Sequence, residues 1–131
     1  MNPIPGNPHQ DLKERLLAAL REVLGERPRS GQWQGERNIA RKGGWPDDYR
    51  IPDLLYLSVR APVKDCGSHY EGAPDIVVEI ASRGDESRDK LEWYRSLGVR
   101  EVWIIEVESR RPVLFGLSDG EYRETVAEGR G

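Results

Sequence analysis

One stretch, Pro74 to Ser82, constrains the fold more than any other part of the chain. It is rich in β-branched residues, and it carries two carboxylates, Asp75 and Glu79. Side chains on a strand alternate between faces, so both carboxylates share one face with Val77 and Ala81. Apolar residues on both faces are typical of a strand in the middle of a sheet. A carboxylate there is costly to bury unless it is paired, protonated or metal-bound, so Glu79 requires an explanation.

The composition describes one small, highly charged domain. The chain has 131 residues, 33% of them charged, and a formal net charge of −3. This balance gives no broad positive field, so any contact with nucleic acid must use local patches. No apolar run approaches the roughly 20 residues that span a bilayer. We therefore expect a cytoplasmic protein with no membrane association, one domain at 9–126, and disordered tails at 1–8 and 127–131.

The spacing of apolar residues predicts a mixed α/β domain. Helices are expected at about 9–25 and 85–97, the second closed by Gly98. Strands are expected at 31–40, 49–60, 74–82, 101–107, 113–117 and 121–126. The order helix, three strands, helix, strand implies a parallel strand pair and a mixed sheet with helices packed on it.

The segment 61–72 is expected to be a loop. It contains Cys66 and His69, which are of residue types that bind soft metals. Such a site would need two more soft ligands, and a chain with one cysteine and two histidines lacks them. The sequence therefore predicts neither a disulfide nor a metal site in this segment.

Two further charged residues lie on faces that the apolar pattern predicts to be buried. Asp53 shares a strand face with Leu55, and Lys90 lies on the same helical line as Tyr94, at about 100° per residue. If the second and third strands pair, Asp53 and Glu79 meet on one face. Two carboxylates with open positions suit Mg²⁺ or Mn²⁺, and a nearby ammonium offsets charge that builds on phosphorus. The structural alternatives are a turn cap for Asp53 and a Lys90 side chain that reaches out to solvent.

Four blocks of sequence occur in an order that resembles a known family. The blocks are Ile51–Asp53, Pro74–Ser82, Arg88–Tyr94 and Gly98–Ile105. They are similar to the Uma-type putative restriction endonucleases, which belong to the PD-(D/E)XK nuclease superfamily. The resemblance implies an α/β domain with a restriction-endonuclease-like αβββαβ core, here followed by a C-terminal hairpin. It also implies dependence on a divalent metal and action on DNA.

The resemblance assigns roles to residues position by position. Asp53 matches the first metal-binding aspartate, and Glu79 matches the acidic residue of the second motif. The lysine that normally follows two residues after that acid is absent, because Ala81 stands there. In this family the lysine has moved to the next helix, which matches Lys90. The implied catalytic set is thus Asp53, Glu79 and Lys90, with Mg²⁺ or Mn²⁺ held by the two carboxylates.

Other polar residues receive weaker roles. Asp75 lies four residues before Glu79, roughly 13 Å along a strand. It is therefore expected to support the metal ligands without binding the metal itself. Gln34 and Arg88 are candidate substrate contacts, although nothing in the sequence ranks them.

The leading hypothesis is a metal-dependent endonuclease that hydrolyses phosphodiester bonds of DNA. We expect a homodimer, because so small a chain has little surface left to grip a duplex. One alternative is a non-catalytic nucleic-acid-binding module on a nuclease scaffold, which would use arginine and lysine side chains outside the acidic site. The other is a structural protein in which Asp53, Glu79 and Lys90 form a buried ion pair.

Overall fold

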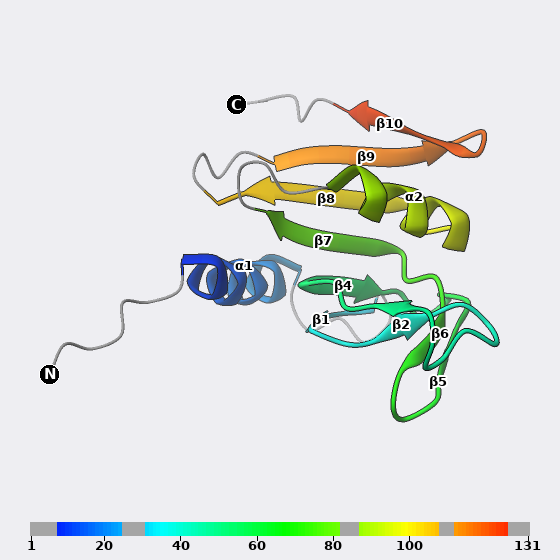
Figure 1. Cartoon of the computed structure of the whole chain (residues 1–131). Helices are drawn as coiled ribbons and strands as arrows, with labels where there is room; N and C mark the ends of the chain where they lie inside the picture. Colours follow the sequence, from blue (N-terminus) through cyan, green and yellow to red (C-terminus); the bar gives the residue numbers. More distant parts are fainter. Residues whose placement is uncertain (1–7, 25–30, 82–86, 108–111, 126–131) are drawn as a thin grey trace, which may run out of the picture.

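The computed structural model describes residues 8–24, 31–81, 87–107 and 112–125. Within these ranges the chain forms two helices and two sheets (Figure 1). The helices are α1 (Pro8–Leu24) and α2 (Ser87–Leu97). The strands are β1 (Gln32–Gly35), β2 (Ile39–Ala40), β3 (Tyr49–Arg50), β4 (Leu54–Leu57), β5 (Val63–Asp65), β6 (Tyr70–Gly72), β7 (Ile76–Ala81), β8 (Glu101–Glu106), β9 (Pro112–Ser118) and β10 (Glu121–Thr125). Neither helix is long and apolar enough to cross a membrane.

The larger sheet has six strands in the order β1-β4-β7-β8-β9-β10. Strands β7 and β8 run parallel and are joined through α2, whereas the other neighbours in this sheet are antiparallel. The succession α1, β1, β4, β7, α2, β8 is the predicted αβββαβ core, and β9 and β10 form the predicted hairpin. The stretch that begins at Pro74 thus becomes β7, in the interior of the sheet, as its apolar pattern predicts.

The two helices cover opposite faces of this sheet. Leu54 and Val78 point toward α1 and pack, together with Trp33, against four leucines of that helix: Leu12, Leu16, Leu17 and Leu20. Leu55 and Val77, one position along each strand, pack instead with aromatic residues of α2. This alternation buries both faces of β4 and β7, and the face beneath α2 is the one that carries Glu79.

The smaller sheet corrects three sequence-based expectations. Its four strands, in the order β3-β2-β6-β5, come from segments on either side of β4. The expected strand at 31–40 is split between the two sheets, and the one at 49–60 breaks around Pro52, which has no N–H to donate to a ladder. The expected loop at 61–72 contains β5 and β6. These strands have only two or three residues each, too few to produce a recognisable alternation.

Two turns follow the sequence-based expectation closely. Gly98 has φ +98° and donates its N–H to the carbonyl of Tyr94, which ends α2. Asp119 and Gly120 both have positive φ, as a two-residue hairpin turn between β9 and β10 requires. The tails expected at 1–8 and 127–131 lie outside the described residues, except for Pro8, which begins α1.

Candidate active site

The pairing of β4 with β7 sets Asp53 opposite Glu79. Leu54 faces Val78 in this antiparallel ladder. Asp53, just before Leu54, therefore faces Glu79, just after Val78. Asp53 is half-buried, and its Oδ2 atom accepts a hydrogen bond of 2.8 Å from the backbone N–H of Ile80. Glu79 is only 5% exposed. Two carboxylates therefore lie side by side at the edge of a buried apolar face.

Helix α2 supplies two side chains that contact the carboxylate of Glu79. The Nζ atom of Lys90 lies 3.5 Å from Glu79 Oε1. The hydroxyl of Tyr94 donates a hydrogen bond of 2.5 Å to Glu79 Oε2. Lys90 and Tyr94 are four residues apart, so they occupy the same side of the helix one turn from each other. The two oxygens of one carboxylate are thereby given different partners, an ammonium and a phenol.

Burial dominates the electrostatics of Glu79. It raises the pKa of the carboxyl above its ordinary value, and the negative charge of Asp53 acts in the same direction. The hydrogen bond from Tyr94 and the charge of Lys90 lower the pKa but do not cancel the effect of burial. Burial and Glu79 together raise the pKa of Tyr94, so this phenol remains a donor. An ionised Glu79 is thus held at a cost that an added cation would offset.

The other predicted site residues lie elsewhere. Asp75 precedes β7, and its Oδ2 atom accepts a hydrogen bond of 2.7 Å from the backbone N–H of Ser58. Gln34 accepts a hydrogen bond from Tyr70, and its Nε2 atom has no hydrogen-bond partner among the described residues. Arg88 belongs to the first turn of α2, and its side chain lies outside the described part of the chain. Asp53, Glu79 and Lys90 are therefore the predicted residues that the fold brings together.

A basic cluster beside these residues had only a partial signal in the sequence. The guanidinium carbons of Arg41 and Arg50 lie 5.2 and 4.7 Å from the ring centre of Trp93, which precedes Tyr94 on α2. Asp48 accepts a hydrogen bond from the Trp93 indole and pairs with both arginines, and these contacts lower its pKa. Three charged residues of the segment 41–50 meet a ring of α2 here, and no local spacing predicts that contact.

Comparison with known proteins agrees with this architecture. The family described as "Uma2: Putative restriction endonuclease" matches residues 1–131. The chain belongs to this family. The Uma2 assignment and the αβββαβ core together support a nuclease. No curated protein matches the sequence.

A solved structure supports the same fold for this Uma2 protein. It is the crystal structure of a putative nuclease belonging to DUF820 from Anabaena variabilis ATCC 29413. The two share 17% sequence identity with a TM-score of 0.66, over 95% of this chain and 70% of the other. At this identity the likeness establishes the restriction-endonuclease-like fold, while the roles of individual residues rest on the geometry above.

Tyr94→Phe provides a direct test of the Glu79 environment. Because the hydrogen bond from Tyr94 lowers the pKa of Glu79, its removal should raise that pKa further. If ionised Glu79 is needed for cleavage, the acidic limb of the pH–rate profile should move to higher pH, with a loss of stability of about 1–3 kcal/mol. Rates measured from pH 5 to 9 check this expectation, and an unmoved acidic limb would contradict it.

Proposed function

We propose that this Uma2 protein is a divalent-metal-dependent endonuclease that hydrolyses phosphodiester bonds of DNA. The observation that carries the proposal is the position of the Lys90 ammonium, 3.5 Å from Glu79 Oε1. In the usual motif a lysine follows the acid on the same strand, whereas here Ala81 occupies that place. Lys90 approaches the same carboxylate from helix α2, which supports a migrated catalytic lysine.

The donor set near Glu79 fits Mg²⁺ or Mn²⁺. Asp53 and Glu79 offer carboxylate oxygens from facing strand positions, and these metals prefer hard oxygen ligands with room for water. Burial raises the pKa of the Glu79 carboxyl, and repulsion from the negative charge of Asp53 adds to that rise. A metal bound here would neutralise this repulsion and polarise a phosphate oxygen. Asp53 and Glu79 are accordingly the proposed ligands.

The other side chains have separate roles in this proposal. Lys90 orients the attacking water and stabilises negative charge that develops on the phosphate oxygens. Tyr94 fixes one oxygen of Glu79, so that the other remains directed toward Lys90. The backbone N–H of Ile80 fixes Asp53 in the same way. These contacts are set by the sheet and by α2, so the geometry is organised before substrate binds.

The cluster of Arg41, Arg50, Asp48 and Trp93 supports a nucleic-acid substrate. Two guanidinium groups beside one carboxylate leave a local positive charge, although the protein as a whole is acidic. Such a charge attracts the phosphates of a nucleic acid. The cluster adjoins the site through α2, because Trp93 and Tyr94 are consecutive. We propose that this cluster contacts the DNA backbone next to the cleaved bond, and that the protein acts as a homodimer.

A metal titration tests the proposed function. Supercoiled plasmid, single-stranded DNA and RNA are incubated with Mg²⁺ or Mn²⁺ over a range of concentrations, with EDTA as the metal-free control. We expect cleavage of DNA that rises with metal and stops in EDTA, together with a higher melting temperature. At a metal concentration ten times Kd, the stabilisation should be about 1.4 kcal/mol. Cleavage that persists undiminished in EDTA would contradict the proposal.

A further inference from the structure

We propose that the hairpin of β5 and β6 carries a second metal site, which binds Zn²⁺ or a similar transition metal. Its ligands are Cys66, His69 and Glu71. The sulfur, nitrogen and oxygen donor atoms of these residues all lie within 4.8 Å of one another. The site belongs to the smaller sheet and shares no residue with the carboxylate pair of β4 and β7.

The strand register explains why these three side chains converge. Asp65 faces Tyr70 and Lys64 faces Glu71 in the antiparallel ladder, so Cys66 faces His69 across the turn. The backbone N–H of Cys66 donates to the carbonyl of His69 at 2.9 Å, which closes this pair. His69 and Glu71 are two apart on β6 and its turn, and therefore lie on the same face. Asp65 and Tyr70 point to the other face, away from this group.

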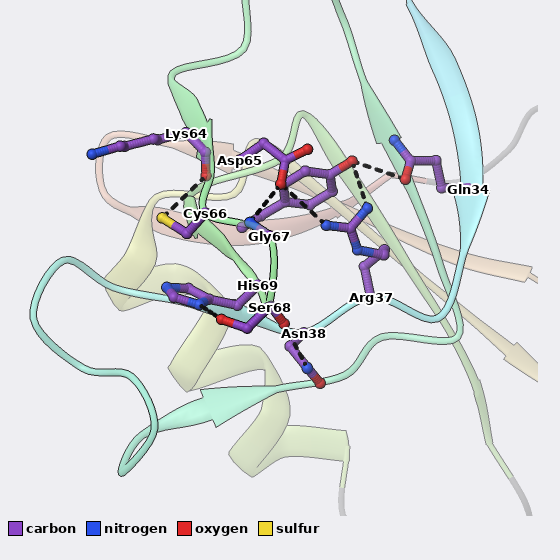
Figure 2. Close-up of polar contacts among 10 residues, drawn as sticks. Gln34, Arg37, Asn38, Lys64, Asp65, Cys66, Gly67, Ser68 and His69 are labelled. Atoms are coloured by element: carbon purple, nitrogen blue, oxygen red, sulfur yellow. Dashed lines mark hydrogen bonds and ion pairs between the residues drawn. The ribbon is translucent and has the colours of Figure 1, made fainter.

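His69 is held in place as a metal ligand usually is. It is 7% exposed, and its ring stacks on Trp45 with the ring centres 4.6 Å apart and the planes 13° apart. Its Nδ1 atom lies 2.8 Å from the hydroxyl of Ser68 (Figure 2). A histidine that binds metal commonly has one ring nitrogen engaged in this way, which fixes its orientation. Nε2 is then the nitrogen assigned to the metal.

Cys66 and Glu71 would complete the site once the Cys66 thiol gives up its hydrogen bond to the backbone carbonyl of Lys64. Cys66 is exposed, and Figure 2 shows its sulfur on the same side of the hairpin as the His69 ring. Tetrahedral Zn²⁺ with usual bond lengths holds its ligand atoms about 3.5 Å apart. The three donors therefore need to approach by no more than roughly 1.3 Å, which rotations of the Cys66 and Glu71 side chains can provide.

The donor types select the metal. Thiolate and imidazole favour Zn²⁺ or Co²⁺ over Mg²⁺, and three protein ligands leave a position for water. On binding, the Cys66 thiol releases its proton to solvent and its sulfur bonds to the metal. The sequence alone predicts no metal site here, because it offers too few soft ligands. Only the pairing of β5 with β6 places the carboxylate of Glu71 beside Cys66 and His69.

Cobalt spectroscopy tests the site, because Cys66 is the one cysteine in the chain. The full chain with Glu79→Gln is titrated with Co²⁺. The substitution removes metal binding by the proposed catalytic carboxylates, so that only the second site is observed. We expect a sulfur-to-cobalt charge-transfer band that saturates at one Co²⁺ per chain and is reversed by Zn²⁺. Cys66→Ser should abolish the band, and Glu71→Gln should weaken Zn²⁺ binding at least tenfold. Asp65→Asn, at an exposed carboxylate of the same hairpin that points to the other face, should change Zn²⁺ affinity less than twofold.

Three results would overturn the proposal. One is the absence of the charge-transfer band at saturating Co²⁺. Another is Zn²⁺ affinity that does not change in Cys66→Ser or Glu71→Gln. The third is a stoichiometry of one metal per two chains, which would place Cys66 between molecules. Since the readout is spectroscopic and the Glu79 site is disabled, failure here leaves the proposed nuclease function unaffected.

Discussion

Lys90→Ala is expected to lower the rate of DNA cleavage by about 10²- to 10³-fold, with little change in KM. Removal of one charged group that stabilises a transition state typically has an effect of this size. Lys90 is partly exposed, with 38% of its side chain accessible, so the fold should tolerate its truncation. The measurement is plasmid cleavage under saturating Mg²⁺ or Mn²⁺, with the melting temperature recorded for each protein.

Lys42→Ala is the matched control, because Lys42 is an exposed lysine in the loop between β2 and β3. It should retain cleavage within about twofold of the unmodified protein. If Lys90 instead belongs to a structural ion pair, Lys90→Ala should lower the free energy of unfolding by roughly 3–5 kcal/mol. A variant that cleaves normally, or that loses activity only because it unfolds, would remove Lys90 from the proposed mechanism.

Glu79→Gln is expected to abolish cleavage and, at the same time, to stabilise the metal-free protein. Burial makes the ionised carboxylate unfavourable, and glutamine keeps the shape without the charge. A gain of about 1 kcal/mol is a reasonable size for such a replacement, equivalent to roughly 3–5 °C in melting temperature. Mg²⁺ or Mn²⁺ should no longer raise the melting temperature of this variant. Glu124→Gln, at an exposed position of β10, is the control and should leave both properties unchanged.

The gain in stability should depend on pH in a defined direction. The pKa of Glu79 is raised in the folded protein, so folding favours its protonated form. Below the ordinary value of 4.5 the carboxyl is protonated in both folded and unfolded chains, and the relative stability is at its highest. That stability is lost as the pH rises through the raised pKa. The advantage of Glu79→Gln should thus be present at pH 8 and small at pH 4, as denaturant titrations would measure. An advantage that is the same at both pH values would contradict this account.

The core of the fold could be predicted because its signals are local. Val77 and Val78 lie on opposite faces of β7, and an apolar run of this kind identifies an interior strand from the sequence alone. The position of Lys90 on the sheet-facing side of α2 likewise follows from helical periodicity. The facing of Asp53 and Glu79 needed one further assumption, the pairing of their strands, and the register supports it.

The smaller sheet could not be predicted because its signals are not local. Ile39 pairs with Tyr70 in a parallel ladder, across thirty-one residues of chain, and the strands involved are too short to show a period. The same reason hid two side-chain groups. Glu71 joins Cys66 and His69 only once β5 and β6 pair, and Arg50 reaches Trp93 only once α2 packs on the sheet.

The most direct test of the proposed function is a crystal of the protein grown or soaked with Mn²⁺. Anomalous difference density should appear between the carboxylates of Asp53 and Glu79, with Lys90 beside it. The same crystal of Glu79→Gln should show no such peak. The absence of manganese density at these carboxylates, under conditions in which the protein cleaves DNA, would contradict the assignment of this site.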